Sequence, residues 1–316
     1  MTDHSHAIKS SRGNEYERDE SFTSSAPVSA KIDTKSGDIA VSVGEGSDIT
    51  VILRASTSRY EYLLEGADVR FNADSNELDI RTLPKNSLGR SKEGKKKRTW
   101  FDFGGYDLDV FVVLPEGSSL EIRSVSGDVA LEGTFDEIKL LTISGDVEAY
   151  GDYDHLDVHT ASGDVSVGHV AGFLKCVTAS GDIACLGAGA ITEVHSASGD
   201  VNVAVTQPGT VTAKVVSGDI LVTVVRGLAV DIDGTTVSGD LGTNIDLDGE
   251  GEGSSDDDTV SIKASTVSGD IRIDTLRSRG EPRGPWEHSS SEEHKHVVHK
   301  GNTELRFGRI ASTPDE

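Results

Sequence analysis

A carboxylate recurs at a regular spacing along this sequence of 316 residues. From Ser126 onward, successive Ser-Gly-Asp tripeptides begin 18, 18, 18, 18, 19, 21 and 30 residues apart. Carboxylates brought into a row can bind a hard cation such as calcium, or they can accept hydrogen bonds from backbone N–H groups. The tripeptide begins at nine serines: Ser36, Ser126, Ser144, Ser162, Ser180, Ser198, Ser217, Ser238 and Ser268.

If the repeats stack, their aspartates form one column. At about 5 Å, neighbouring carboxylates repel by roughly 1 kcal/mol in water and by roughly 3 kcal/mol at an effective dielectric constant near 20. Either turn hydrogen bonds from backbone N–H groups and Ser hydroxyls offset this repulsion, or bound cations do. A hydroxyl column two residues before each Ser, which includes Thr142 and Thr160, favours the first alternative, a structural turn ladder. The predicted column holds Asp128, Asp146, Asp164, Asp182, Asp200 and Asp219.

The acidic stretch "LDGEGEGSSDDD" lies in the 30-residue gap before the last repeat and is predicted to be a loop. Counted from Asp246, its acids resemble part of a twelve-residue calcium loop, with Gly251 at position 6. The motif lacks flanking helices and ends in Asp instead of Glu, so a solvated acidic loop is the favoured interpretation. The sequence therefore predicts no cofactor and leaves calcium as the alternative. Its candidate ligands are Asp246, Asp248, Glu250, Asp256 and Asp257.

A basic island, "KNSLGRSKEGKKKRTWFDF", interrupts the otherwise acidic chain at residues 85–103. Basic residues beside aromatic ones can contact an anionic membrane surface, here through 92–101, or a nucleic acid. A long hairpin loop whose aromatic residues pack on the protein is the favoured alternative. The candidate contact residues are Lys95, Lys96, Lys97, Arg98 and Trp100.

Histidines and cysteines offer weaker signals. Three histidines of the stretch "HSSSEEHKHVVHK", beginning with His294, could bind metal, but this stretch is predicted to be disordered. His159 and His195 share a column two coils apart, which is too far for a chelate. Cys176 and Cys185 fall in apolar columns half a coil apart, and we expect two reduced thiols in the core.

The elements that carry these residues are strands. Three and five residues after each Ser the sequence places apolar side chains, such as Val165 and Val167, and further apolar columns lie four and six residues before it. Steps of two between apolar columns are typical of strands. Each repeat is thus predicted to be a strand, a Ser-Gly-Asp turn, a strand and a second turn, which must stack on its neighbours to bury its apolar face.

The line "YDLDVFVVLPEGSSLEIRSVSGDVAL", followed by repeated "SGDV/I" strands, resembles the bacterial putative-adhesin β-strand-repeat family. The resemblance runs from roughly Val28 to Ile273 and implies a right-handed β-solenoid with no shared catalytic residues. We therefore predict an all-β fold: a parallel β-solenoid (β-helix) of about 18-residue coils with a β-rich N-terminal cap.

The predicted organisation has four parts. Residues 1–27 form a disordered tail, and 28–118 form the β-rich cap region with its basic loop at 85–99. Residues 119–275 form the Ser-Gly-Asp solenoid with an acidic insert at 244–259. Residues 276–316 are mostly disordered, with a last strand at 303–310.

The bulk composition limits the function. A net charge of −24 argues against a nucleic-acid partner. The N-terminus has no apolar core typical of a signal peptide, and no apolar run is long enough for a membrane helix, so a cytoplasmic location is the default expectation, with the cell surface as the alternative. We expect no enzyme but an adhesin-like scaffold with an extended binding surface for a protein or glycan. The alternatives are a self-assembling β-helix filament and a polysaccharide-acting enzyme.

Overall fold

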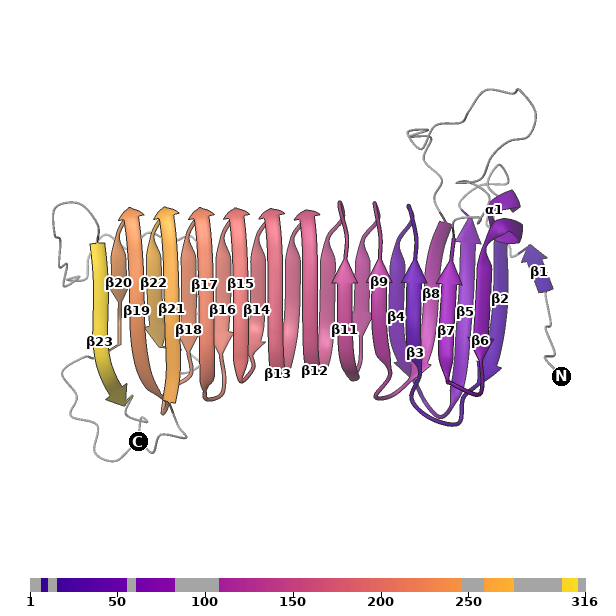
Figure 1. Ribbon diagram of the computed structural model, residues 1–316, viewed down its shortest axis with the longest axis horizontal. Coiled ribbons are helices and arrows are strands. Elements are labelled where there is room, and N and C mark those ends of the chain that lie inside the picture. The colour runs from indigo at the N-terminus through magenta and orange to yellow at the C-terminus, as the bar shows by residue number, and fades with distance from the viewer. Residues whose placement is uncertain are drawn as a thin grey trace, which may run out of the picture. The chain divides into compact units, whose positions relative to one another are not determined.

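The computed structural model describes residues 7–10, 16–55, 61–82, 108–245, 259–275 and 303–311, with the backbone alone at 7–10, at Glu61 and at 303–311. The chain divides into two compact units, Met1–Tyr153 with Val158–Ala161, and Asp154–Asp157 with Ser162–Glu316. Figure 1 labels the elements of both. The protein is all-β and dominated by sheet, and the described residues include one short helix. Over these residues, no helix has the length and apolar character needed to cross a membrane.

The first unit consists of strands that pair along their edges and of one short helix. Its elements are β1 (Ala7–Ser10), β2 (Tyr16–Thr23), β3 (Ser29–Asp33), β4 (Ile39–Gly44), β5 (Asp48–Ala55), α1 (Glu61–Gly66), β6 (Asp68–Asn72), β7 (Glu77–Arg81), β8 (Leu108–Pro115), β9 (Ser119–Arg123), β10 (Val129–Glu132) and β11 (Phe135–Leu141). Strand β12 (Val147–Ser162) contributes to both units.

Two parallel ladders run through the first unit. One joins β7, β3, β9 and β11, and the other joins β8, β4, β10 and β12. The coil β3–β4, with its turn at Ser36, therefore stacks directly on the coil β9–β10, with Ile39 opposite Val129. Segments predicted to form a cap thus include a coil of the repeat itself. Antiparallel pairs of β5 with β8, β2 with β5, β1 with β2 and β6 with β7 complete the unit.

A buried ion pair holds the short helix to this unit. Arg18 on β2 is buried beside Glu20, and its guanidinium donates hydrogen bonds to the carbonyls of Leu64 and Ala67 at 2.7 and 2.8 Å. These two carbonyls lie at the C-terminal end of α1, where backbone acceptors lack helical partners. The arginine thus satisfies them while its own charge is compensated by the glutamate.

The second unit continues the repeat. Its strands are β13 (Val165–Ser180), β14 (Ile183–Ala188), β15 (Ile191–Ser198), β16 (Val201–Val205), β17 (Gly209–Ser217), β18 (Ile220–Val224), β19 (Ala229–Ser238), β20 (Leu241–Thr243), β21 (Thr259–Ser268), β22 (Ile271–Thr275) and β23 (Thr303–Ala311). Parallel pairing sets Val165 opposite Ile183 and Phe173 opposite Ile191, so both ladders advance by 18 residues.

The aliphatic columns predicted from the period form the core of this unit. The residues three after each Ser, among them Val165, Ile183, Val201 and Ile220, are at most 5% exposed. The hydroxyl column lies inside as well, since Thr178 and Thr266 are 3% exposed. Alternation of side chains along each strand puts these columns on one face and leaves polar residues on the other.

The last two coils are stacked in an order that differs from their order in the sequence. Strand β21 lies between β17 and β19, with Ser268 opposite both Ser217 and Ser238. Charge on the outer face suits this arrangement, because Lys263 lies between the neutral Thr212 and the acidic Asp233. The chain passes over one coil between β18 and β19, and the longer stretch between Ser238 and Ser268 then returns it to the coil that lies between them. Strand β23 then pairs antiparallel with β19.

Close packing at the turn requires glycine. Gly199 has φ +131°, and a Cβ at this position would lie 2.2 Å from the carbonyl oxygen of Gly181 in the neighbouring coil. Both the left-handed backbone and the backbone contact exclude a side chain. Gly242, by contrast, has no atom within 4 Å of such a Cβ.

We predict that Gly199→Ala lowers the free energy of unfolding by about 2–4 kcal/mol, because it adds backbone strain to a steric clash. The matched control Gly242→Ala should change it by less than about 1 kcal/mol. Urea unfolding followed by circular dichroism measures both. Equal effects of the two substitutions would contradict the close contact at the turn.

Candidate functional site

The Ser-Gly-Asp corners form an edge that we call the turn edge: the residue before each Ser, the Ser itself and the Asp. The hydroxyl residue two before Ser points inward and braces the corner. Thr236 Oγ1 donates to the carbonyl of Gly269 at 3.0 Å, and Thr266 Oγ1 donates to the carbonyl of Gly218 at 3.2 Å. The side chains of the turn edge itself face outward.

In the second unit, the aspartates of the turn edge are linked from coil to coil. The backbone N–H of each Asp donates to Oδ1 of the preceding Asp, as from Asp200 to Asp182 at 2.7 Å and from Asp219 to Asp200 at 2.8 Å. The same bond runs from Asp182 to Asp164, from Asp270 to Asp219 and from Asp240 to Asp270, each at 2.8 Å. The ladder therefore follows the exchanged order of the last two coils.

The first unit contains the same ladder. Asp146 N–H donates to Asp128 Oδ1 at 2.9 Å, Asp128 N–H to Asp38 Oδ1 at 3.0 Å, and Asp38 N–H to Asp109 Oδ1 at 3.0 Å. Asp109 belongs to no Ser-Gly-Asp tripeptide, so the repeated motif does not predict it. Its sequence signal is the Asp that directly precedes the core residue Val110, as Asp128 precedes Val129.

These hydrogen bonds offset the repulsion between the stacked carboxylates. A hydrogen bond to a charged acceptor contributes roughly 1.5–3 kcal/mol, which is comparable to the repulsion expected at this spacing. The donors are backbone N–H groups, as the turn alternative requires, but they come from the next coil instead of from the same turn. Within the described residues, no group of three or more His, Cys, Asp or Glu side chains is placed to hold a metal ion.

The remaining predicted sites fall differently. The candidate calcium ligands Asp246, Asp248, Glu250, Asp256 and Asp257 lie outside the described residues, as do Lys95, Lys96, Lys97, Arg98 and Trp100 and the histidines near His294. The neighbours of the basic island are described: Thr82 N–H donates to the carbonyl of Asp33, and Leu108 N–H to that of Ser36. The chain thus leaves and re-enters the coil β7–β8 at the corner where other coils carry Ser-Gly-Asp.

Both cysteines are buried and form no disulfide. Burial raises the pKa of Cys185 to about 11, and it raises the pKa of Cys176 well above its ordinary value. Neither thiol has the lowered pKa of a catalytic nucleophile.

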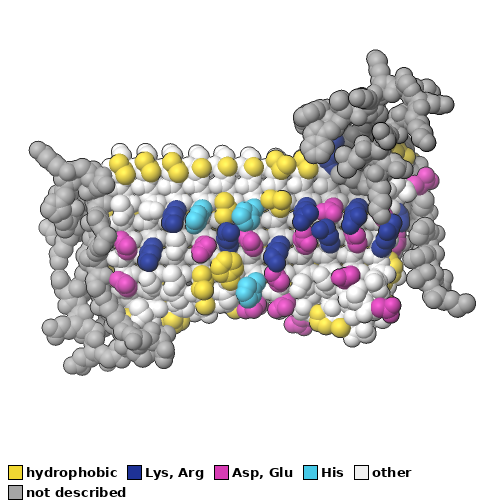
Figure 2. Space-filling model, viewed as in Figure 1, with side chains coloured by type: hydrophobic (Ala, Val, Ile, Leu, Met, Phe, Trp, Pro, Cys, Tyr) yellow, Lys and Arg dark blue, Asp and Glu magenta, His cyan; other side chains and the backbone are white. Residues whose placement is uncertain are grey.

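One sheet face carries charges of alternating sign. In the first unit, Lys31 faces Asp79 on one side and Glu121 on the other, with its Nζ 3.2 Å from Glu121 Oε1. Lys31 is also the main reason why the pKa of Glu121 is lowered. Figure 2 shows blue and magenta side chains along this face. Such pairs set the register of neighbouring strands more than they form a site.

The two solenoid histidines lie in different units, His159 on β12 in the first and His195 on β15 in the second. His195 lies opposite Val177 and Lys214, and it is half-buried. Desolvation, followed by the nearby Lys214, lowers its pKa. This environment favours a neutral imidazole over a charged one.

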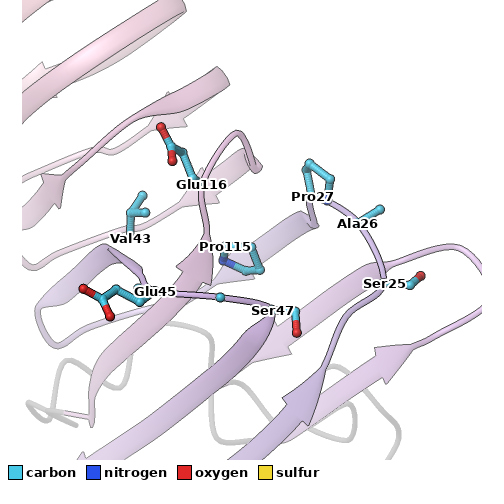
Figure 3. A pocket seen from close by; sticks show the side chains of 10 residues that line it. Ser25, Ala26, Pro27, Val43, Glu45, Ser47, Pro115 and Glu116 are labelled. Atoms are coloured by element: carbon cyan, nitrogen blue, oxygen red, sulfur yellow. The ribbon is translucent and has the colours of Figure 1, made fainter.

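A depression of about 570 Å³ in the first unit is lined by turn residues and by the ends of β4 and β8 (Figure 3). Its charged lining residues are Glu45 and Glu116, and both are exposed. Two solvated carboxylates and two serines, with no basic residue in the lining to activate a serine hydroxyl, provide no catalytic arrangement. The depression is lined by Ser25, Ala26, Pro27, Val43, Gly44, Glu45, Gly46, Ser47, Pro115 and Glu116.

The fold and the turn edge together define an all-β repeat protein whose stacked turns share a row of carboxylates. Residues 66–274, about two thirds of the chain, match the model of the family described as Toastrack DUF4097, and the chain belongs to this family. None of the curated proteins matches the chain.

Several solved structures are similar at low identity. A "putative lipid binding protein" from Parabacteroides distasonis is 14% identical, with 84% of this chain and 98% of that chain covered and a TM-score of 0.41. A "putative adhesin" from the same species is 13% identical, with 82% and 97% covered and a TM-score of 0.36. A "putative adhesin" from Bacteroides fragilis is 14% identical, with 82% and 97% covered and a TM-score of 0.33.

The family description and the names of these neighbours include no enzyme. The resemblance inferred from the sequence is supported at the level of an adhesin-like family of uncharacterised function.

We predict that Asp200→Ala lowers the free energy of unfolding by about 1 kcal/mol, because it removes the acceptor of the Asp219 N–H. Asp200→Asn keeps an oxygen acceptor and relieves repulsion, so its effect should be smaller. Urea unfolding at low and high salt measures both. An asparagine variant as unstable as the alanine variant would show that the charge, and not the acceptor, stabilises the ladder.

We also predict that neither cysteine reacts with a thiol reagent in the native protein. At pH 8, a thiol with a pKa of about 11 is ionised in roughly one molecule in a thousand. The reaction rate should rise at least about 100-fold in denaturant, where burial is lost. Rapid modification of one thiol under native conditions would contradict its burial.

Proposed function

We propose that this protein is a non-enzymatic interaction protein, a scaffold that presents its turn edge as an extended binding surface. One observation carries this proposal: at every described Ser-Gly-Asp corner from Ser126 onward, the residue before Ser is an exposed apolar side chain. Val125, Ile143, Val216, Val237 and Val267 are between 39% and 55% exposed. Repeated surfaces on stacked units suit elongated partners, because each coil adds the same contact.

We also propose that the strands wind as a right-handed solenoid. The register offset of 18 residues supports a solenoid of about 18-residue coils, and a right-handed winding follows from the resemblance. The predicted cytoplasmic location, the contact of 92–101 with an anionic membrane and the calcium loop stay predictions. A protein or a glycan remains the expected partner.

The turn edge also supports binding in preference to catalysis. Its aspartates accept backbone N–H groups in one repeated environment, so the hydrogen bonds of neighbouring aspartates are alike. Glycoside hydrolysis needs two carboxylates with different roles on either side of a bond. A repeated, uniform row is better suited to contact than to bond cleavage.

The test is a panel of glycans and peptides scored for binding and for cleavage. We expect ligands that are retained without chemical change, and binding that weakens when Val216 and Val267 are both replaced by Ser. The control, Val177→Ser, changes the same residue type on the sheet face and should have little effect. Turnover of a glycan would overturn the proposal, and so would binding that ignores the turn edge.

Sizing chromatography over a concentration series separates the scaffold from the filament alternative. A scaffold keeps one size, whereas a β-helix filament grows with protein concentration. Growth that stops when strand edges are blocked would favour the filament.

A further inference from the structure

The turn edge of the second unit contains an apolar row with a defined order. Its exposed fractions are 55% at Val216, 50% at Val267 and 51% at Val237, in the order in which the coils stack. Ala179 and Ala197 continue the row on the preceding coils and are also exposed. Figure 2 shows yellow side chains in a line along this edge. Three half-exposed valine side chains at one edge form a candidate contact surface.

A row of carboxylates runs beside the apolar row, three residues further along each coil. Every carboxylate of the row before Asp240 accepts a backbone N–H on its Oδ1, which holds the row at the coil spacing. Arg272, which follows Asp270 by two residues, forms an ion pair with Asp274, and its Nε lies 2.6 Å from Asp274 Oδ2. Lys214 lies on the sheet-face side of the apolar row, away from the carboxylates. The row consists of Asp182, Asp200, Asp219, Asp270 and Asp240.

We propose that this edge binds a cationic peptide segment with an apolar stripe, best fitted by an amphipathic helix; the inference rests on the binding function proposed above and names its partner class. The apolar stripe of the helix would cover Val216, Val267 and Val237. Its Lys or Arg side chains on one flank would reach the carboxylate row.

The spacings of the two partners match. Coils lie about 4.8 Å apart, and one turn of helix rises about 5.4 Å. Over four coils the difference amounts to about 2 Å, which flexible Lys and Leu side chains can absorb. Side chains on one face of an extended strand recur every 6.6–6.8 Å or so and fall out of step after one coil.

The shape and charge of the edge disfavour a second copy of the protein. The apolar row is one residue wide, whereas a stable interface needs roughly 800 Å² per partner. Two copies that meet at this edge would also bring two carboxylate rows together in a protein of net charge −24. A narrow cationic partner avoids both costs.

The experiment uses the full chain and a synthetic 18-residue Leu/Lys peptide with Leu at helical i, i+3, i+4 and i+7 spacing. A peptide of the same composition with its leucines scattered is the control for the stripe. Fluorescence anisotropy at low and physiological salt gives the affinities. The scattered peptide should bind about tenfold more weakly, because it offers charge without a continuous apolar contact.

Protein variants locate the contact. The triple variant Val216→Ser, Val267→Ser and Val237→Ser should weaken binding about tenfold, since it removes the exposed apolar row. Asp219→Asn with Asp270→Asn keeps both oxygen acceptors, so the ladder remains, and should weaken binding about threefold or more with a reduced salt dependence.

Two controls separate the edge from general attraction to an acidic protein. Asp231→Asn with Glu148→Gln removes the same amount of charge at exposed positions outside the turn edge and should change the affinity by less than about twofold. Val177→Ser, which replaces an apolar side chain outside the turn edge, should also change the affinity by less than about twofold. Circular dichroism and urea midpoints confirm that each variant is folded.

Three results would overturn the inference. The first is equal binding of the two peptides, and the second is a triple Ser variant that binds as the unchanged protein does. The third is a concentration-dependent dimer that the triple Ser variant abolishes, which would identify a second copy as the occupant. If another ligand of the panel still depends on the turn edge, only the partner class fails; if no ligand does, the proposed function fails with it.

Discussion

The contact between one turn and the next determines most of this structure. At most of the Ser-Gly-Asp corners, such as those of Gly127 and Gly199, a glycine with positive φ lies against the backbone carbonyl of the glycine in the neighbouring coil. Because no side chain intervenes, the next residue's N–H comes within reach of the previous aspartate. Glycine, carboxylate and coil spacing are thus parts of one contact, and the parallel ladders on either side continue from it.

That contact also explains the surface. An aspartate that must accept an N–H from the next coil cannot turn inward, so every coil adds a carboxylate to the same edge. The residue before Ser has to point outward as well, because the hydroxyl residue before it supports the corner from inside. The second unit fills this outward position with Ala or Val. A surface with both apolar and acidic rows is therefore the outcome of the turn geometry combined with the choice of one residue per coil.

The exchanged order of the last two coils shows how specific the stacking is. Every Ser-Gly-Asp corner can in principle stack on every other, because their turn geometry is the same. Side chains outside the turn distinguish the coils: Lys263 faces Asp233 and the neutral Thr212. Charges alternate in the same way in the first unit, where Lys31 lies between Asp79 and Glu121 on neighbouring strands. Exposed pairs of this kind contribute little stability, but they make the wrong neighbour unfavourable.

The sequence by itself determined the repeat, the strand positions and the inward columns, since a period of 18 with apolar steps of two has one consistent burial pattern. It also identified six aspartates of the ladder and both core cysteines. The tertiary structure decided which N–H each carboxylate accepts, the membership of Asp109, the place of the coil at Ser36 and the order of the last two coils. These features depend on contacts between residues up to 90 positions apart, such as Asp38 with Asp128. A local pattern states which face a side chain takes, but only the packed chain decides which coil lies beside it.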